Sequence, residues 1–541
     1  ASEPLVADPV DIAFDESGRM FVVEITGFNQ TDKTKTHSRV QVLEDTNGDG
    51  RMDRGTTLAE DLDYAQGLLP MKGGVLVTTN SAILFLRDSD GDGKADLKEV
   101  LFECTKSINI DRQMGSPRRG IDNAIYINLG LGKKDITPPG APGRKLELAN
   151  NNLRYDPATG EISASSGAGQ FGNTFDDWGR QFFSMNRNPV LHAVLPHRFL
   201  KRNPPAFLTG GDEDAAPAGG EGKVYPLKIF RTTATVHAGT FTAACGIGAY
   251  RGDLLGDDYV DNLFVCEPTG ELVSRWIPEP SGASVKARRA QPGREFLASD
   301  DEWFRPVNTT TGPDGALYVV DMYRRFIDGD RFFPPDYRAA NEMGAGSDRG
   351  RIYRVVPKGG AASPARTPLP REAAKRVALL DHPNGWHRDT AQRLLVESRD
   401  SSVVPALEAL LNNSGSAKAR LHALWTIVGL GRLEPKHVRT ALADAAPGVV
   451  ENGLWLAARF LRSDDSIRKR VLALAADKNL RLRFAGLLVA GDLDGPETTR
   501  ALIQAGVRDA EDRWMRTAIL SSPATQSGQL LAALVNEPAF R

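Results

Sequence analysis

Six hairpin-like segments recur within the first 360 residues, and this repetition constrains the fold more than any other feature. Each has a short apolar segment, a turn containing Gly or Asp, and a second apolar segment. The six are Val10–Phe14 with Met20–Glu24, Gly67–Leu69 with Val75–Asn80, Arg119–Asn123 with Ala124–Asn128, Asn173–Asp176 with Gln181–Asn186, Gly246–Tyr250 with Asn262–Glu267, and Asn308–Thr311 with Ala316–Asp321. Repeats at roughly 50–70 residues predict a six-bladed β-propeller. A β-sandwich would explain the strands but not the six similar hairpins.

The last strand-like segment of this region is Gly350–Val356. We expect it to complete a blade together with N-terminal chain, because such closure leaves no open sheet edge. The sequence therefore predicts a propeller domain over residues 1–358.

The pattern changes after a linker at residues 359–371, which is rich in Gly, Ala, Ser and Pro. From residue 372 to residue 541 the chain is rich in Ala, Leu and Arg. Similar segments recur there at intervals of about 30–32 residues. Their equivalent positions are Ala391, Ala423, Gly453, Ala485 and Thr517. Two short helices per interval predict an all-α solenoid of HEAT type.

Charge and composition exclude several partners. The chain has 67 Lys and Arg against 69 Asp and Glu, a formal net charge of −2, so we expect no nucleic-acid partner. No apolar run reaches the roughly 20 residues of a membrane span.

The three cysteines, Cys104, Cys245 and Cys266, form no zinc or haem motif. Cys245 and Cys266 are the last residues of the strand-like segments Thr242–Cys245 and Leu263–Cys266, and whether they form a disulfide or stay two buried thiols is open.

Two near-duplicate acidic loops carry the sharpest local chemistry. Oxygen donors at alternate positions, with Gly at the sixth, resemble the spacing of calcium-binding loops. We expect the residues at ligand positions to be Asp45, Asn47, Asp49, Arg51 and Asp53 in the first loop, and Asp88, Asp90, Asp92, Lys94, Asp96 and Glu99 in the second. The second should bind Ca²⁺ more tightly, because Glu99 stands at position 12 where the first loop has Thr56. The alternative is two metal-free Asp/Gly turns.

A ligand site is expected at the mouth of the propeller channel. Polar residues end the second strand of each hairpin: Glu24, Asn80, Asn128, Asn186, Glu267 and Asp321. Arginines near this face would suit a carboxylate-bearing ligand, although each alone is typical of a structural arginine. The candidate cofactor-binding residues are Arg112, Gln113, Arg187, Glu267, Arg305, Tyr323 and Arg324. The candidate catalytic residues are His192, His237 and Asp321.

Several longer motifs resemble those of planctomycete and verrucomicrobial proteins labelled membrane-bound dehydrogenases. The matching stretches include Ser2–Pro9, both acidic loops, Gly169–Gly179, Thr242–Gly246, Tyr250–Asp253, Phe264–Pro268, Trp303–Pro306 and Asp348–Tyr353. That family joins a propeller similar to quinoprotein glucose and sorbosone dehydrogenases to HEAT repeats, and often to a c-type cytochrome. The cytochrome module is absent from this chain, and Arg112–Pro117 has no histidine where those dehydrogenases tend to place their base.

The resemblance implies an extracytoplasmic, periplasmic or cell-surface oxidoreductase acting on a sugar or alcohol. Its cofactors would be pyrroloquinoline quinone (PQQ) and structural Ca²⁺, and its electrons would pass to a separate or trimmed c-type cytochrome. Two other functions fit the same fold. One is a non-catalytic propeller–HEAT scaffold that binds a glycan or a redox partner. The other is a propeller hydrolase or lactonase.

Overall fold

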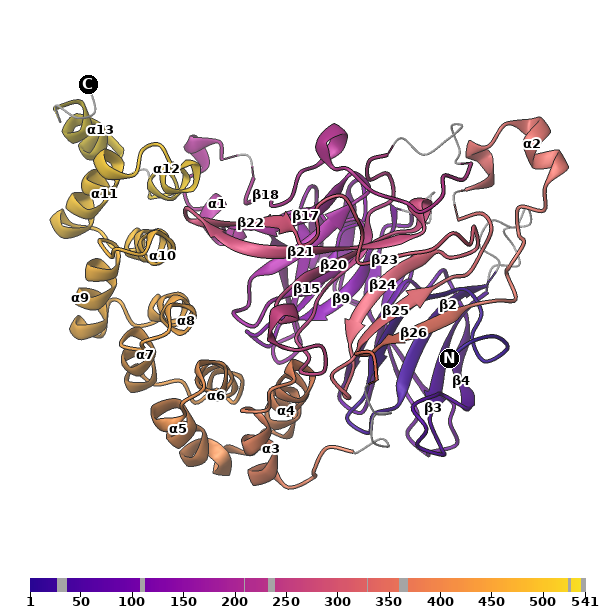
Figure 1. Cartoon of the computed structure of the whole chain (residues 1–541). Helices are drawn as coiled ribbons and strands as arrows, with labels where there is room; N and C mark the ends of the chain where they lie inside the picture. The colour runs from indigo at the N-terminus through magenta and orange to yellow at the C-terminus, as the bar shows by residue number, and fades with distance from the viewer. Residues whose placement is uncertain are drawn as a thin grey trace.

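The computed structural model describes residues 1–26, 37–107, 112–208, 210–231, 239–327, 329–359, 368–523 and 527–536. Six β-sheets follow one another through the described N-terminal part and form a six-bladed propeller, which confirms the predicted fold class. Five of the six predicted hairpins supply the first two strands of one blade, and the predicted first strand of the third is displaced. Figure 1 shows the blades beside an arc of helices formed by the C-terminal residues.

Blades 1 to 3 contain β1 (Pro9–Phe14), β2 (Met20–Thr26), β3 (His37–Glu44), β4 (Arg54–Leu62), β5 (Gly67–Met71), β6 (Gly74–Thr78), β7 (Ala82–Arg87), β8 (Leu97–Cys104), β9 (Gly115–Arg119), β10 (Ile125–Asn128), β13 (Asn152–Asp156) and β14 (Glu161–Ser165). The hairpin of β11 (Lys134–Thr137) and β12 (Leu146–Leu148) leaves blade 3 and extends the sheet of blade 2. In blade 3 the first strand lies N-terminal to the predicted Arg119–Asn123, because residues 120–124 form the turn.

Blades 4 to 6 contain β15 (Asn173–Phe175), β16 (Gln181–Met185), β17 (Asn188–Ala193), β18 (Asp212–Asp214), β19 (Cys245–Ala249), β20 (Leu263–Glu267), β21 (Leu272–Ser281), β22 (Ser284–Arg289), β23 (Leu297–Ala298), β24 (Pro306–Thr311), β25 (Leu317–Asp321) and β26 (Arg351–Val355). Ser2 bridges Arg351 in antiparallel fashion, and the Ile352 amide donates to the Ala1 carbonyl at 3.0 Å. N-terminal chain therefore closes blade 6, as predicted.

Each blade buries its apolar residues against the next blade. Cys245 and Cys266 lie directly opposite each other on β19 and β20 and are both free thiols buried in this core. The open question of the disulfide is answered by the structure in favour of two thiols.

The helices are α1 (His197–Leu200), α2 (Pro335–Ala340), α3 (Ala373–Leu379), α4 (Gly385–Ser398), α5 (Val404–Asn413), α6 (Ala417–Gly429), α7 (Pro435–Leu442), α8 (Pro447–Ala457), α9 (Asp465–Leu474), α10 (Leu480–Ala490), α11 (Pro496–Arg508), α12 (Arg513–Leu520) and α13 (Ser527–Asn536). Among the residues placed in the structure, no helix combines the length and apolar character needed to cross a bilayer.

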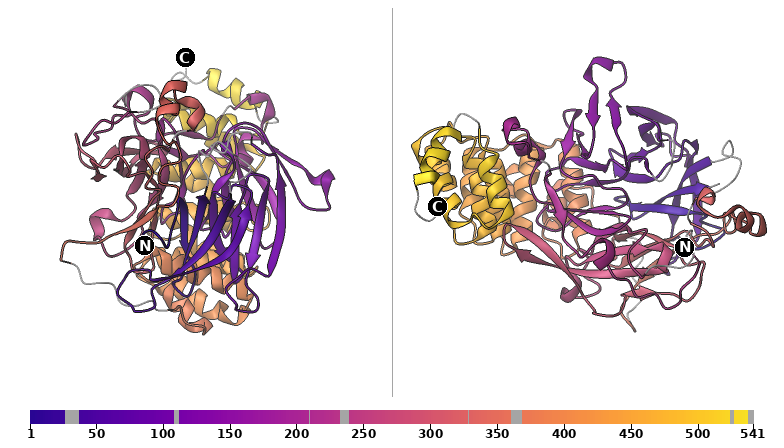
Figure 2. Two further views of the ribbon diagram at one scale, coloured as in Figure 1. Left: turned by 90° about the vertical axis from the view of Figure 1, so that its right-hand side faces the viewer. Right: turned by 90° about the horizontal axis from the view of Figure 1, so that it is seen from above.

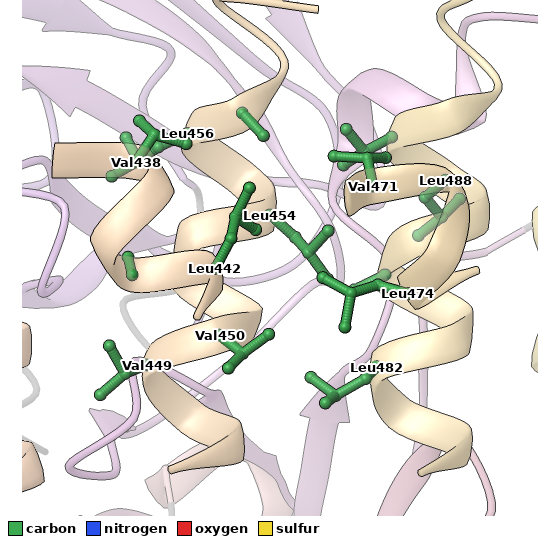
Figure 3. Close-up of a cluster of buried hydrophobic side chains, with 14 of the residues drawn as sticks. Val438, Leu442, Val449, Val450, Leu454, Leu456, Val471, Leu474, Leu482 and Leu488 are labelled. Atoms are coloured by element: carbon green, nitrogen blue, oxygen red, sulfur yellow. The ribbon is translucent and has the colours of Figure 1, made fainter. Parts of the chain in front are cut away.

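The C-terminal helices stack in two rows. The repeat positions predicted from the sequence fall on α4, α6, α8, α10 and α12, which form the row nearer the propeller. Leucines and valines between the rows form one continuous core, shown in Figure 3 around Leu442, Leu454 and Leu474. The two further views in Figure 2 show the helices gathered on one side of the propeller. The helical architecture is thus confirmed, while its assignment to the HEAT type stays a prediction.

Candidate functional site

The three carboxylates among the polar residues predicted at the second-strand ends have structural partners. Glu24 accepts a hydrogen bond from the Ala7 amide at 3.0 Å, and Asp321 accepts one from the Arg305 amide at 2.7 Å. Glu267 accepts hydrogen bonds from the Thr242 and Ala243 amides. In each case the amide belongs to the segment that enters the first strand of the same blade. These buried carboxylates tie the ends of two strands together instead of forming an open ring for a ligand.

Arg305 and Arg324 are also engaged inside the protein. Arg305 is 5% exposed and donates to the carbonyls of Pro268, Arg324 and Arg325 at 2.7–3.0 Å, and it pairs with Glu271. Arg324 is fully buried, with Asp8 as an ion-pair partner at 3.4 Å. Neither guanidinium fits the carboxylates of a quinone cofactor, because each would have to leave its buried partners. Both residues are therefore structural arginines, the alternative considered for each of them from the sequence.

The other four proposed cofactor residues do not form one cluster of shared contacts. Arg112 and Arg187 are exposed. The buried Gln113 donates to the Tyr64 carbonyl at 2.7 Å. The Tyr323 hydroxyl donates to Asp301 at 2.9 Å, and the Arg351 guanidinium lies 3.4 Å from its ring centre.

Of the two proposed catalytic histidines, the structure describes His192. His192 lies on β17, is fully buried and stacks on Phe182, with Nδ1 3.1 Å from the Ser284 hydroxyl. Burial lowers the pKa of His192 well below its usual value. Its place in the interior of the blade contradicts the expected position at the channel mouth, because the third strand of a blade packs against its neighbours. His237 lies outside the described residues.

Asp321 is the candidate base with the most unusual surroundings. Its Oδ1 accepts hydrogen bonds from the amides of Arg305 and Tyr323 at 2.7 and 2.8 Å. Burial nevertheless raises the pKa of Asp321 to about 7. The carboxyl can therefore hold or release a proton near neutral pH, although it has no exposed surface.

The second acidic loop joins β7 to β8 and gathers its carboxylates. One oxygen from each of Asp88, Asp90 and Asp92 lies within 4.8 Å of the others, a spacing that could hold a metal ion. Asp96 instead accepts from the Ser89 amide at the base of the loop. Glu99 is not part of this group and lies on β8 opposite Phe85.

The first acidic loop joins β3 to β4 and repeats the same backbone hydrogen bonds. Asp45 accepts from the amides of Gly48 and Gly50, as Asp88 does from Gly91 and Gly93. Asp53 accepts from the amide and hydroxyl of Thr46. Calcium binding by both loops stays a prediction.

A cavity of about 180 Å³ lies where the propeller channel meets α4. The first strands of all six blades line it, and α4 contributes Trp386, Asp389, Thr390 and Arg393. This cavity lies at the opposite end of the first strands from the ligand site predicted from the sequence. Its walls come from seven separate segments, so no local motif marks it.

The cavity wall combines aromatic rings with charged groups. Its aromatic residues are Phe14, Phe175 and Trp386. Arg251 donates a hydrogen bond from each Nη atom to Asp389, at 2.6 and 3.1 Å. Arg118 likewise donates two hydrogen bonds to Asp11, at 3.1 and 3.0 Å. The Asp389 side chain is 43% exposed, whereas those of Arg118, Arg119, Arg251 and Arg393 are at most 18% exposed.

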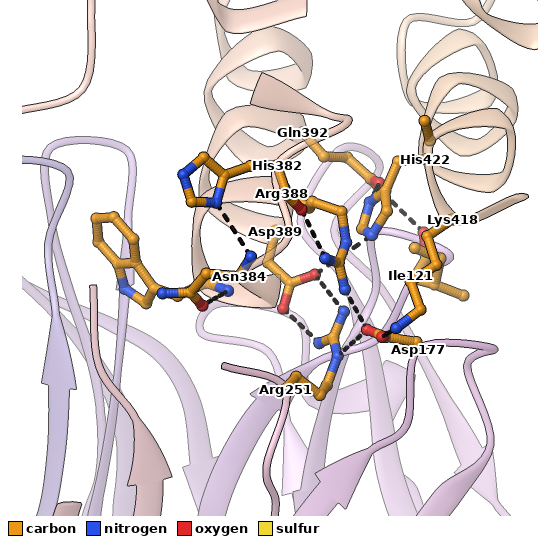
Figure 4. Close-up of polar contacts among 12 residues, drawn as sticks. Ile121, Asp177, Arg251, His382, Asn384, Arg388, Asp389, Gln392, Lys418 and His422 are labelled. Atoms are coloured by element: carbon orange, nitrogen blue, oxygen red, sulfur yellow. Dashed lines mark hydrogen bonds and ion pairs between the residues drawn. The ribbon is translucent and has the colours of Figure 1, made fainter. Parts of the chain in front are cut away.

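A charged cluster fixes α4 and α6 to the turns of the propeller (Figure 4). Asp177, in the turn between β15 and β16, pairs with Arg251 of the propeller, Arg388 of α4 and Lys418 of α6. Gln392 of α4 donates to the Ile121 carbonyl and to Asn123 at 2.8 Å. Specific contacts therefore hold these helices against one end of the channel.

No curated protein matches this chain. Among solved structures, it is similar to a Thermus thermophilus protein described as a glucose dehydrogenase-type oxidoreductase, at 17% identity and a TM-score of 0.37 over 65% of this chain and 99% of that one. It is also similar to the soluble aldose sugar dehydrogenase of Escherichia coli, at 15% identity and a TM-score of 0.32 over 66% and 99%.

A third similar structure is virginiamycin B lyase from Staphylococcus aureus, at 14% identity and a TM-score of 0.32, covering 58% of this chain and 77% of that one. A fold by itself selects no chemistry. One family model matches residues 1–359, and the chain belongs to that family, described as a domain of unknown function (DUF7133).

Proposed function

We propose that this protein binds a sugar-class small molecule in the cavity between the propeller channel and α4, as a non-catalytic binding protein. The observation that carries the proposal is the cavity itself, in which Asp389 and Arg251 lie beside the aromatic residues Trp386 and Phe175. Carboxylates and guanidinium groups bind sugar hydroxyls, and the apolar faces of a sugar ring pack on aromatic side chains.

The size of the cavity suits one six-membered ring. A protein cavity of about 150 Å³ holds benzene, and this one measures about 180 Å³. Asp389 retains acceptor capacity for ligand hydroxyls, because 43% of its side chain is exposed.

Isothermal titration calorimetry with D-glucose, D-galactose, D-glucuronate and D-galacturonate tests the proposal. We expect at least one sugar to bind, and Asp389→Asn to weaken that binding by about tenfold or more, because a hydrogen bond to a charged group contributes about 1.5–3 kcal/mol. Asp300→Asn, at an exposed position away from the cavity lining, is the matched control. If no sugar binds, or if Asp389→Asn binds as tightly as the wild type, the proposal is wrong.

Asp321 favours a second candidate, the sugar or alcohol oxidoreductase implied by the family resemblance. A carboxyl with a pKa raised to about 7 has the acid–base range of a general base. Arg305 and Arg324 do not fit the carboxylates of a quinone cofactor, because both guanidinium groups are buried against partners within the protein. The extracytoplasmic location and the cytochrome partner stay predictions of the resemblance.

Dye reduction with added PQQ, Ca²⁺ and a panel of sugars and alcohols separates the two candidates. A binding protein gives no dye reduction above the protein-free background. Turnover that Asp321→Asn abolishes would favour the oxidoreductase instead.

A further inference from the structure

The arginines of the cavity wall all have acidic partners. The four that line the cavity are Arg118, Arg119, Arg251 and Arg393. Arg118 donates two hydrogen bonds to Asp11, and Arg251 donates two to Asp389. These two pairs therefore contribute no net charge to the wall.

The other two arginines share two glutamates. Arg393 donates to Glu16 at 2.8 Å and to Glu397 at 3.1 Å. Arg119 Nη2 lies 3.8 Å from Glu397 Oε1, and its Nη1 donates to the Asn123 carbonyl at 3.1 Å. Glu16 follows β1 and Glu397 lies on α4, and neither is among the residues that line the cavity. Both glutamates therefore act on the wall from behind it.

The charge states of Arg119 and Glu16 follow from their surroundings. Burial lowers the pKa of Arg119 to about 10, which still leaves the guanidinium protonated at neutral pH. Burial alone would raise the pKa of Glu16, but the charge and the hydrogen bond of Arg393 outweigh it and lower the pKa, so this glutamate is ionised. The four arginines of the wall are thus offset by four carboxylates, and no surplus charge of either sign faces the cavity.

A charged ligand in this cavity would have no free counter-charge. The four arginine side chains are at most 18% exposed, and each is already paired with a carboxylate of the protein. Asp389 is 43% exposed, but a ligand cation beside it would also lie beside Arg251. A charge that loses its hydration without gaining a partner is destabilised. Hydroxyl groups avoid this cost, because they donate to a carboxylate without adding a charge.

We infer that the ligand of this cavity is an uncharged sugar, and that Glu16 and Glu397 set this specificity by neutralising Arg393 and Arg119. The inference rests on the proposed sugar-binding function and adds the charge of the ligand to it. The two glutamates act through the arginines and do not contact the ligand. The missing counter-charge rejects acidic and basic sugars alike, which is specificity through an unfavourable alternative.

Calorimetry with two pairs of ligands of similar shape tests the inference. D-Glucuronamide and D-glucuronate differ in the charge of one group, and so do D-glucose and D-glucosamine at about pH 6, where an amino group is protonated. We expect the uncharged member of each pair to bind at least about tenfold more tightly, which corresponds to about 1.4 kcal/mol. If either charged sugar binds as tightly as its uncharged counterpart, the inference is overturned and the sugar-binding function stands.

Removing one negative charge from behind the wall gives a second measurement. Glu397→Gln keeps the shape of the side chain and leaves the two arginines with Glu16 alone. We expect it to strengthen the binding of D-glucuronate relative to D-glucuronamide by about tenfold. Glu16→Gln should act in the same direction but more weakly, because that side chain is 32% exposed and water screens its charge. Glu279→Gln, which breaks an exposed ion pair with Arg288, is the matched control and should keep the wild-type preference.

The outcomes separate this inference from the function on which it rests. If no sugar binds, both are overturned. If Glu397→Gln and Glu16→Gln keep the wild-type preference for uncharged ligands, the role of the two glutamates is overturned. A loss of affinity shared by D-glucuronate and D-glucuronamide would mark a merely structural effect and would also overturn that role. Should both variants fail to fold, the two ligand pairs on the wild-type protein still decide whether the ligand is uncharged.

Discussion

Asp177 holds three cations at the boundary between the propeller and the helices, and its side chain is 1% exposed. Burial alone would raise the pKa of Asp177, but the charges of Arg251, Arg388 and Lys418 outweigh it and hold the pKa well below its usual range. The stability that this carboxylate contributes is therefore present above the pKa of an unfolded aspartate and is lost only as the pH falls below it.

Asp177→Asn should lower the free energy of unfolding at pH 7 by about 3–5 kcal/mol, because it leaves buried cations without their common partner. Denaturant unfolding measures this. Glu279→Gln is the control, since that exposed ion pair with Arg288 should contribute about 1 kcal/mol or less. Equal losses in the two variants would contradict the role given to Asp177.

Asp321 should show the opposite pH dependence. With a folded-state pKa of about 7, the folded protein keeps a proton that the unfolded chain releases near pH 4, so its contribution to stability falls as the pH rises to about 7. Asp321→Asn cannot ionise. Its loss of unfolding free energy between pH 5 and pH 8 should be smaller than that of the wild type by about 2 kcal/mol. Identical pH profiles from denaturant unfolding would show that this pKa is not raised.

The hairpins and acidic loops could be predicted because the sequence patterns that mark them are local. Alternation of apolar residues, Gly-containing turns and repeated Asp spacing all act within a few residues of chain. Of the six polar residues predicted at the ends of the second strands, Asn128, Glu267 and Asp321 are the last residues of β10, β20 and β25. Their role was not predictable, because the Ala7 and Arg305 amides that Glu24 and Asp321 bind become neighbours only when each strand pair forms.

The second acidic loop should bind Ca²⁺ through Asp88, Asp90 and Asp92. Calcium at about 100 times its dissociation constant would add about 2.7 kcal/mol to the stability, seen as a higher melting temperature than in chelator. Replacing Asp90 and Asp92 by Asn should remove most of this shift, and Glu99→Gln reports whether that glutamate is a ligand. If chelation leaves the melting temperature of the wild type unchanged, neither loop stabilises the fold through calcium.

The helical region is docked on the propeller through close contacts. A Cβ atom on Gly448, at the start of α8, would lie 2.1 Å from the ring of Trp178 in blade 4. Asn452, one turn later on α8, donates to the Trp178 carbonyl at 3.0 Å. Only a glycine lets this helix approach the propeller so closely.

Gly448→Ala should lower the free energy of unfolding by about 1–3 kcal/mol, because the added methyl group overpacks this contact. Gly415→Ala is the matched control in the same helical region, since a Cβ there meets nothing within 4 Å. Its effect should stay within about 0.5 kcal/mol. Thermal or denaturant unfolding that ranks the two variants equally would contradict a tightly docked helical region.

The cavity could not be predicted from the sequence because it exists only in the assembled molecule. Gln392 reaches the Ile121 carbonyl across 271 positions of chain, and Asp389 meets Arg251 across 138. No local pattern records such pairs. For the same reason the sequence predicted Arg305 and His192 as site residues. Their burial depends on contacts between distant segments, which the sequence does not show.

A crystal structure of the protein soaked with D-glucose would show directly whether a sugar binds in the cavity beside α4. We expect electron density for the sugar in the cavity, with its hydroxyl groups next to Asp389. Sugar density beside Asp321 and Glu267 at the other end of the channel, with the cavity beside α4 empty, would contradict it.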